Sequence, residues 1–134
     1  MDILVVSNVI LDILTEDKKW FSWSSETLAY LAEQNTLVIN PLIFAEVSIR
    51  FERIEDLEDA LSPSLFRHDP LPWEAAFLAG KCFLAYRRRG GRKRSPLPDF
   101  FIGAHAAVAG ISLLTREISR YQTYFPSLKL ISPY

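Results

Sequence analysis

Two short apolar runs, each followed at once by residues that begin helices, constrain the fold of this chain most strongly. Ile3–Val6 and Thr36–Ile39 are rich in β-branched residues, and such runs are typical of strands that are buried on both faces of a parallel sheet. Ser7-Asn8 follow the first run, and Asn40-Pro41 follow the second. Ser and Asn are favoured at helix N-caps and Pro at the first helical position. The pattern therefore predicts strands that lead directly into helices.

The rest of the chain continues this alternation. Further strands are predicted at Ile111–Thr115 and Leu128–Ile131, where apolar residues again run together. Helical spacing of apolar residues, Pro starts and Gly ends predict helices over residues 9–14, 24–34, 41–49, 54–61, 73–88 and 98–110. This order favours an α/β fold with a mainly parallel sheet of four or five strands flanked by helices. With 134 residues and no repeat or polar linker, we expect one domain over residues 1–134.

Several protein classes are excluded by the composition. A lone cysteine, Cys82, rules out an intramolecular disulfide framework and a Cys-based zinc cluster, and it indicates a reducing compartment. No uncharged apolar stretch reaches the ~18 residues of a membrane span. The N-terminal residues Met1-Asp2-Ile3 lack the basic region of a signal peptide. We therefore expect a cytoplasmic globular protein without a membrane partner.

Charge is unevenly distributed, although the formal net charge is only −1. The near-neutral balance argues against non-specific coating of nucleic acid but allows one local basic patch. A basic run consists of Arg87, Arg88, Arg89, Arg92, Lys93 and Arg94. Three interpretations of this run stay open: a solvated helix end, contact with RNA phosphates, and docking of a protein partner.

Three carboxylates lie near the predicted ends of strands. Glu46 is in the helix after the second strand, Asp99 is in the first turn of the helix at 98–110, and Glu117 follows the third strand. Functional groups in a parallel α/β sheet gather where the strands end. The three side chains are either dispersed in solvent or converge on a hard cation such as Mg²⁺ or Mn²⁺. Convergence would suit phosphodiester hydrolysis, because a bound cation orients a water and lowers its pKa.

Four segments occur in an order that resembles a known family. They are Ile3–Asp12, Asn40–Glu46, Leu97–Ala106 and Leu113–Glu117, and together they extend over essentially the whole chain. The pattern resembles the PIN domain and, more narrowly, the VapC toxins of bacterial toxin–antitoxin pairs. The resemblance implies a Mg²⁺- or Mn²⁺-dependent endoribonuclease that cleaves RNA. It also implies a homodimer and a VapB-type antitoxin that inserts a peptide into the acidic pocket of the toxin.

The same resemblance assigns roles to individual residues. Glu46 and Asp99 match the second and third acidic positions of the family, and Glu117 stands where the fourth is usually aspartate. These three would hold the metal. Ser7 and Asn8 match the residues that follow the first acidic position, and they complete the implied catalytic set.

Two further positions qualify this assignment. Thr115 matches a residue that supports the site, by a hydrogen bond to a neighbouring carboxylate. Val6 occupies the first acidic position of the family, and a hydrocarbon side chain cannot bind a cation. Three carboxylates in place of four should weaken divalent binding, since ligand charge tunes the affinity for hard cations.

Two explanations of Val6 stay open: a naturally degenerate PIN domain, or an inactivated variant of an active nuclease. We therefore expect a VapC-type endoribonuclease with reduced activity in this chain. The alternative is a PIN module that acts only by binding protein or RNA.

Overall fold

Five parallel strands form one sheet with the N-terminal strand at its centre. The structure, a computed structural model, describes residues 1–92 and 97–134. Within these residues the strand order is β3-β2-β1-β4-β5, and every neighbouring pair is parallel. The strands are β1 (Asp2–Val5), β2 (Thr36–Ile39), β3 (Arg67–His68), β4 (Ser112–Leu114) and β5 (Leu130–Ile131). The predicted α/β fold with a mainly parallel sheet is confirmed.

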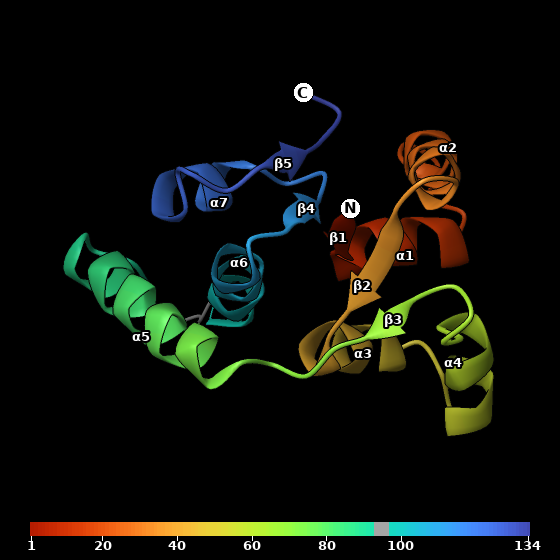
Figure 1. The fold of residues 1–134 in the computed structure, drawn as a ribbon, viewed down its shortest axis with the longest axis horizontal. Helices are drawn as coiled ribbons and strands as arrows, with labels where there is room; N and C mark the ends of the chain where they lie inside the picture. The colour runs from red at the N-terminus through yellow and green to blue at the C-terminus, as the bar shows by residue number, and fades with distance from the viewer. Residues whose placement is uncertain (93–96) are drawn as a thin grey trace.

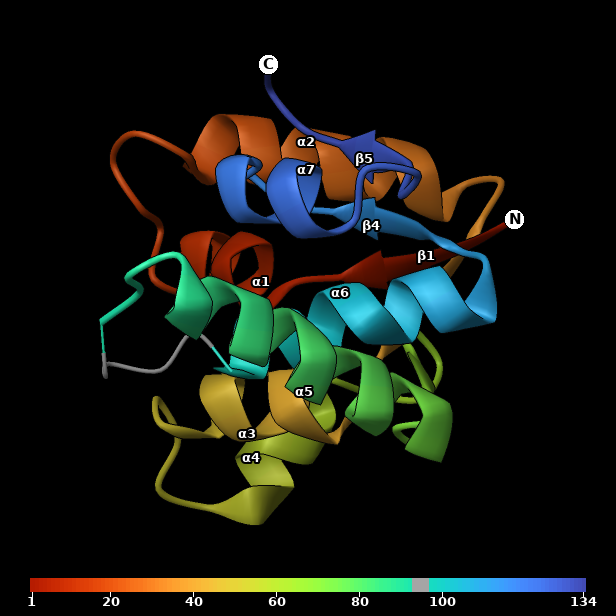
Figure 2. The same ribbon diagram turned by 90° about the vertical axis from the view of Figure 1, so that its left-hand side faces the viewer.

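Helices cover both faces of this sheet. In Figure 1, α5 and α6 lie on one side of the strands and α1 and α2 on the other. Figure 2 shows α5 packed against α6, with both helices below β1 and β4 in that view. The helices of the described residues are α1 (Ser7–Leu14), α2 (Phe21–Ala32), α3 (Pro41–Ser48), α4 (Ile54–Ala60), α5 (Trp73–Arg88), α6 (Leu97–Ala109) and α7 (Ser119–Tyr124). None of them is both long and apolar enough to cross a membrane.

The last three residues of β1 are apolar because they have neighbours on every side. Ile3, Leu4 and Val5 are completely buried. In the sheet, Ile3 lies opposite Leu37 of β2 and Ser112 of β4. A buried parallel strand of this kind has no solvent face, so its sequence shows no alternation of polar and apolar residues.

The start of α3 is fixed by a buried polar pair. The Asn40 side chain accepts a hydrogen bond from the Ile43 N–H at 2.9 Å, as expected of an N-cap. Its amide nitrogen lies 3.0 Å from Nδ1 of His105 on α6. His105 is buried, and burial lowers the pKa of its imidazole. His105 therefore has a structural role and lies outside the candidate site described below.

Four differences from the sequence prediction stand out. The strand β3 and the helix α7 were not predicted, because β3 has only two residues, both exposed, and α7 is a helix of six residues. The helix α2 begins at Phe21, three residues before the predicted start at Ser24. The predicted strand over 128–131 is reduced to β5.

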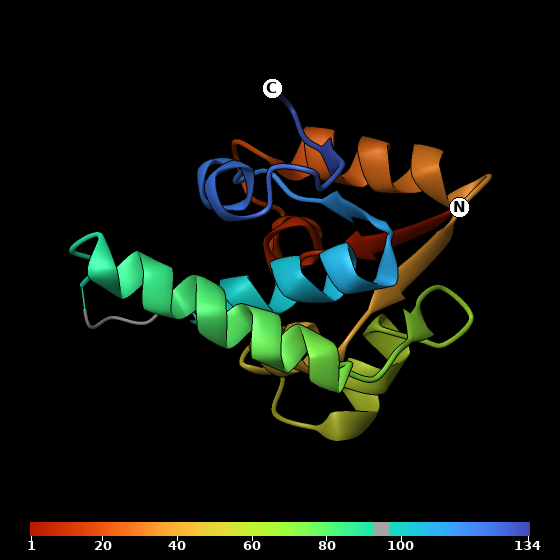
Figure 3. The same cartoon turned by 60° about the vertical axis from the view of Figure 1, so that its left-hand side comes forward.

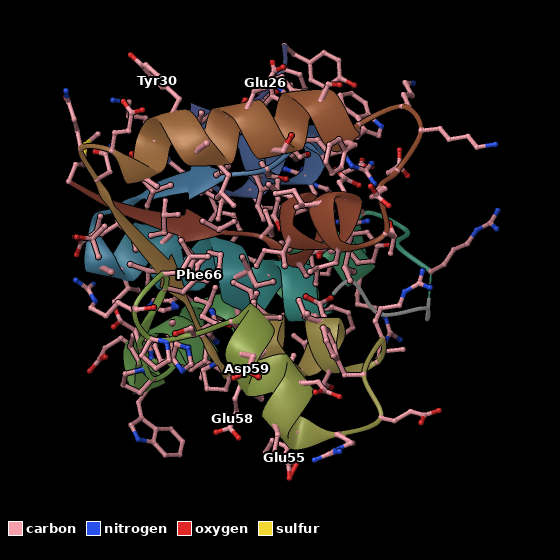
Figure 4. The ribbon with its side chains drawn as sticks, turned by 90° about the vertical axis from the view of Figure 1, so that its right-hand side faces the viewer. Glu26, Tyr30, Glu55, Glu58, Asp59 and Phe66 are labelled. Atoms are coloured by element: carbon pink, nitrogen blue, oxygen red, sulfur yellow. The ribbon has the colours of Figure 1, made fainter. Side chains whose placement is uncertain are left out.

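Two surface features follow from the local sequence. Figure 4 shows Glu55, Glu58 and Asp59 on the outer face of α4, and all three are exposed. The helix α5 ends at Arg88 and is followed by Gly90 with φ of +87°. Glycine adopts this left-handed conformation without the strain of a Cβ atom, which explains why the helix stops there.

Candidate functional site

An acidic pocket lies where β1 and β4 end. Its volume is about 420 Å³. The helices that follow these strands contribute to it, together with α3 and the first turn of α6. The lining residues are Val6, Ser7, Asn8, Glu46, Asp99, Glu117, Ser119, Arg120 and Tyr121. All five residues of the predicted catalytic set therefore line one pocket, and their chemical roles stay predictions.

Glu46 and Asp99 are the two predicted ligands that a residue of another helix holds by a hydrogen bond. The Ser7 hydroxyl donates a hydrogen bond to Oε1 of Glu46 at 2.9 Å, so α1 orients a carboxylate of α3. Asp99 accepts a hydrogen bond from Nη1 of Arg120 at 2.7 Å through its Oδ2. Each carboxylate therefore already has one partner from another helix.

Glu117 lies at the rim of the pocket. Its side chain is 72% exposed, and Oε1 is 3.3 Å from Nη1 of Arg116. A glutamate has one methylene more than the aspartate of the family pattern, and here the longer side chain turns toward solvent. Among the three predicted ligands, Glu117 is thus the least enclosed.

The expected partner of Thr115 is different in the structure. The Thr115 hydroxyl exchanges hydrogen bonds of 3.1 Å with the main-chain carbonyl and N–H of Glu117. It bonds to no carboxylate among the described residues. Thr115 therefore shapes the loop that carries Glu117, because the main chain two residues on offers a donor and an acceptor within reach.

Arg116 anchors the same loop to Asp12 on α1. Its Nε and Nη2 atoms lie 2.9 Å and 3.2 Å from the Asp12 carboxylate, whose side chain is only 3% exposed. The Ser24 hydroxyl donates a further hydrogen bond of 2.8 Å to Asp12. Through Asp12, the loop after β4 is therefore joined to α1 and α2.

Val6 lines the pocket at the end of β1. Its side chain is 3% exposed, and it occupies the N-cap position of α1 with no side-chain capping bond. The Val6 N–H donates to the Leu114 carbonyl at 3.1 Å, which holds this residue against β4. Val6 thus extends the apolar strand and presents hydrocarbon to the acidic pocket.

Burial and crowding disturb the acid–base behaviour of the pocket. Burial raises the pKa of Glu46, and the Asp99 carboxylate raises it further, while the Ser7 hydrogen bond opposes this shift. Burial also raises the pKa of Tyr121, with contributions from Asp99 and Glu46. The Tyr121 phenol therefore stays protonated near the carboxylates.

The raised pKa of Glu46 implies that its charge costs stability. The folded chain holds this proton more tightly than the unfolded chain, so ionisation above the unfolded pKa of about 4.3 destabilises the fold. We expect Glu46→Gln to raise the free energy of unfolding at pH 7 without added metal, because Gln still accepts from Ser7. The gain should disappear as the pH falls below 4.3.

Urea unfolding at pH 7 and at pH 4 measures this effect. The matched control is Glu26→Gln on α2, where the glutamate is exposed (Figure 4). A loss of stability in Glu46→Gln at pH 7 would contradict the argument.

Sequence reasoning missed Arg120 and Tyr121, which both line the pocket. They lie three and four residues after Glu117 on α7, and that helix is too short to show a periodic pattern. The charge of Arg120 was the one available signal, because this cation, like Arg116, lies close in sequence to the predicted ligand Glu117.

The basic run at the end of α5 lies near this pocket. Figure 3 shows the last turn of α5, the start of α6 and α7 at the same end of the molecule. The guanidinium groups of Arg87 and Arg89 lie over the rings of Phe83 and Tyr124, at 5.8 Å and 5.4 Å from the ring centroids. Arg87, Arg88, Arg89 and Arg92 are exposed, whereas Lys93 and Arg94 lie outside the described residues.

The pocket offers the oxygen ligands that hard divalent cations prefer. Oδ1 of Asn8 is buried and has no hydrogen-bond partner in the described part of the chain. An unpaired amide oxygen on a residue that lines the same pocket as Glu46 and Asp99 fits a cation or a water that a cation holds. Elsewhere in residues 1–92 and 97–134, as in this pocket, no three His, Cys, Asp or Glu side chains form a compact metal cluster. The oxygen ligands of the pocket therefore fit a hard cation, but they carry fewer negative charges than the ligands of a strong site.

Comparison with known sequences identifies one family. The sequence model of the PIN domain matches residues 3–124. No curated protein matches the sequence.

Solved structures of three bacterial complexes are similar to this chain. VapBC2 from Rickettsia felis, bound to a DNA fragment from its promoter, is 20% identical with a TM-score of 0.73, covering 98% of each chain. VapBC-1 from nontypeable Haemophilus influenzae is 16% identical with a TM-score of 0.74, again covering 98% of each chain. FitAcB from Neisseria gonorrhoeae is 18% identical with a TM-score of 0.71, covering 98% of this chain and 97% of that one. At these identities the similarity shows a shared fold.

Proposed function

This chain belongs to the PIN domain family, and we propose that it is the toxin of a VapBC-type toxin–antitoxin pair with an endoribonuclease site. The observation that carries the proposal is the acidic pocket itself. Glu46 and Asp99 come from helices far apart in the sequence and meet beside Ser7 and Asn8, where two central strands end. This is the edge of a parallel sheet where active sites are usually built.

Glu46 and Asp99 would hold a Mg²⁺ or Mn²⁺ ion, with oxygens of Ser7 and Asn8 beside them and Glu117 at the rim. Such an ion supplies a polarised water and charge stabilisation for phosphodiester cleavage. Ser7 orients the Glu46 carboxylate through Oε1. Tyr121 adds a protonated phenol that can donate to a phosphate oxygen.

The chain as given should cleave RNA slowly, since Val6 contributes no charge to the pocket. The second candidate is a PIN module that only binds, and two observations favour it. Val6 presents hydrocarbon at the strand end, and Arg120 neutralises Asp99. The two candidates differ in one respect: a chain with aspartate at position 6 is a nuclease in the first and remains inactive in the second.

Cleavage of a labelled single-stranded RNA in Mn²⁺ tests the proposal, with a DNA of the same sequence alongside. We expect internal cleavage of RNA by Val6→Asp, much slower cleavage by the unchanged chain, and none by Val6→Asp combined with Asp99→Asn. An inactive Val6→Asp protein that still folds would leave only the binding module.

Two partners complete the proposal, and we expect the protein to act in the cytoplasm. One is a VapB-type antitoxin, which should be encoded by a small adjoining gene and should copurify when the two are coexpressed. The other is a second copy of the chain. Trp73 and Phe77 on α5 are 88% and 69% exposed, which supports an apolar contact between copies. Light scattering at micromolar concentration should give the mass of a dimer, and a monomer would contradict it.

A further inference from the structure

A cation of the chain itself lies in the acidic pocket. Nη1 of Arg120 donates to Oδ2 of Asp99 at 2.7 Å. The guanidinium also lies over the rings of Tyr86 and Phe100, at 5.8 Å and 5.9 Å from their centroids. The Arg120 and Asp99 side chains are 37% and 40% exposed, so this ion pair is open to solvent on one side.

Aromatic rings hold this guanidinium in place. Tyr86 and Phe100 pack edge to face at 5.7 Å, and Phe100 packs on Tyr124 at 5.0 Å. Tyr86 belongs to α5, Phe100 to α6 and Arg120 to α7. An exposed ion pair alone is weak, but stacking on two rings restricts the positions that the guanidinium can adopt. Arg120 therefore stays at the mouth of the pocket when its hydrogen bond to Asp99 is broken.

A fixed positive charge at this place opposes a metal ion. It engages one oxygen of Asp99, and it repels any divalent cation that approaches the same carboxylate. With Val6 at the strand end, the pocket already lacks one negative charge, so the effect of Arg120 is proportionally larger.

The same guanidinium suits a phosphodiester. Its planar fork matches phosphate oxygens as well as it matches a carboxylate, and arginine on an aromatic ring is a common phosphate ligand. A phosphate that takes the guanidinium releases Asp99. Release of Asp99 returns one negative charge to the pocket.

We propose that Arg120 is a positioning residue that exchanges Asp99 for a substrate phosphate, so that the cation site on Asp99 forms only when a phosphodiester is bound. The inference rests on the proposed function of this pocket. It makes cation and RNA binding mutually reinforcing, since coupling between two ligands is reciprocal.

Two titrations with opposite expected signs test this exchange. The first is calorimetry with Mn²⁺ alone. Arg120→Gln removes a positive charge that lies 2.7 Å from Oδ2 of Asp99, and with it the repulsion of a divalent cation. It should bind Mn²⁺ about tenfold more tightly, the size of change that groups around metal ligands produce. Arg120→Lys, which keeps the charge, should resemble the unchanged chain. Lys81→Gln on α5 removes a positive charge that lies over Phe77 and should leave the Mn²⁺ affinity unchanged.

The second titration measures binding of a labelled single-stranded RNA in EDTA by fluorescence anisotropy. Here Arg120→Gln should bind about tenfold more weakly, the loss expected for one charge-assisted contact. A merely structural role of Arg120 would not tighten one ligand while weakening the other.

The outcomes separate this inference from the proposed function. If the unchanged chain binds Mn²⁺ too weakly to measure, both titrations are repeated with Val6→Asp and Val6→Asp/Arg120→Gln. Equal Mn²⁺ affinity in that pair, or unchanged RNA affinity without Arg120, overturns the exchange and leaves the proposed nuclease intact. Failure of every variant to bind Mn²⁺ overturns the metal site and the exchange together.

Discussion

Replacing Val6 with aspartate is expected to increase the affinity for Mn²⁺ by more than about a hundredfold, because even groups that only orient metal ligands change affinity by about 10–100-fold. Val6 lines the pocket with Glu46 and Asp99, so a carboxylate at this position adds charge where hard cations need it. Calorimetry with Mn²⁺ on the two proteins measures the difference.

The same change has a second effect through the helix that follows. Val6 is the N-cap of α1 and makes no side-chain capping bond, whereas an aspartate there caps a helix and gains about 0.5–2 kcal/mol over an apolar residue. Without metal, repulsion from Glu46 and Asp99 opposes this gain. The melting temperature of Val6→Asp should therefore rise much more on addition of Mn²⁺ than that of the unchanged chain.

Val6→Asn separates the two contributions. Asparagine caps a helix about as well as aspartate but brings no charge, so it should stabilise the chain without creating metal dependence. If Val6→Asn gains as much Mn²⁺ affinity as Val6→Asp, or if neither gains any, the charge argument is wrong.

Among the substitutions proposed for this chain, Arg116→Ala is expected to lower the free energy of unfolding most. Breaking a buried ion pair by removing one partner costs about 3–5 kcal/mol, since the remaining charge is left uncompensated. In Arg116→Ala that charge is the carboxylate of Asp12, which is 3% exposed and keeps only the hydrogen bond from Ser24. Urea unfolding at low temperature measures the change in the free energy of unfolding.

Two controls make this prediction specific. Arg67→Ala breaks ion pairs with Asp2 and Asp69, in which the arginine side chain is 46% exposed, and it should cost less than Arg116→Ala, because exposed pairs contribute about 0.2–1 kcal/mol each. The double variant Asp12→Asn/Arg116→Met removes both charges and should recover much of the loss, because no buried charge remains. A cost below that of Arg67→Ala would show that the Asp12 pair contributes nothing.

The parts of the fold that follow from local chemistry were predictable from the sequence. The last three residues of β1 and of β2 are apolar and buried because both strands lie inside the sheet, and Asn40 caps α3 as its sequence indicates. The strand β3 pairs two exposed residues with the end of β2. These two residues are a strand only because they pair with β2. Their own residue types do not indicate a strand.

The candidate site, too, was predictable only in part. The carboxylates Glu46 and Asp99 could be placed near strand ends from the order of elements alone. The partners that determine their charge could not, because Ser7 reaches Glu46 across 39 positions and Arg120 reaches Asp99 across 21. Such pairs depend on the packing of whole helices, which a linear pattern does not encode.

The central place of β1 also has a consequence for the order in which the molecule is completed during synthesis. Its first neighbour, β2, is made soon afterwards, but its second, β4, begins only at Ser112. Until then one edge of β1 has no partner, and closing a loop of this length makes the pairing slow. Arg120, the last cation of the pocket, is translated later still. A ribosome-bound chain therefore carries Glu46 and Asp99 before it carries β4 and Arg120, and the pocket is assembled only after α7 has been made.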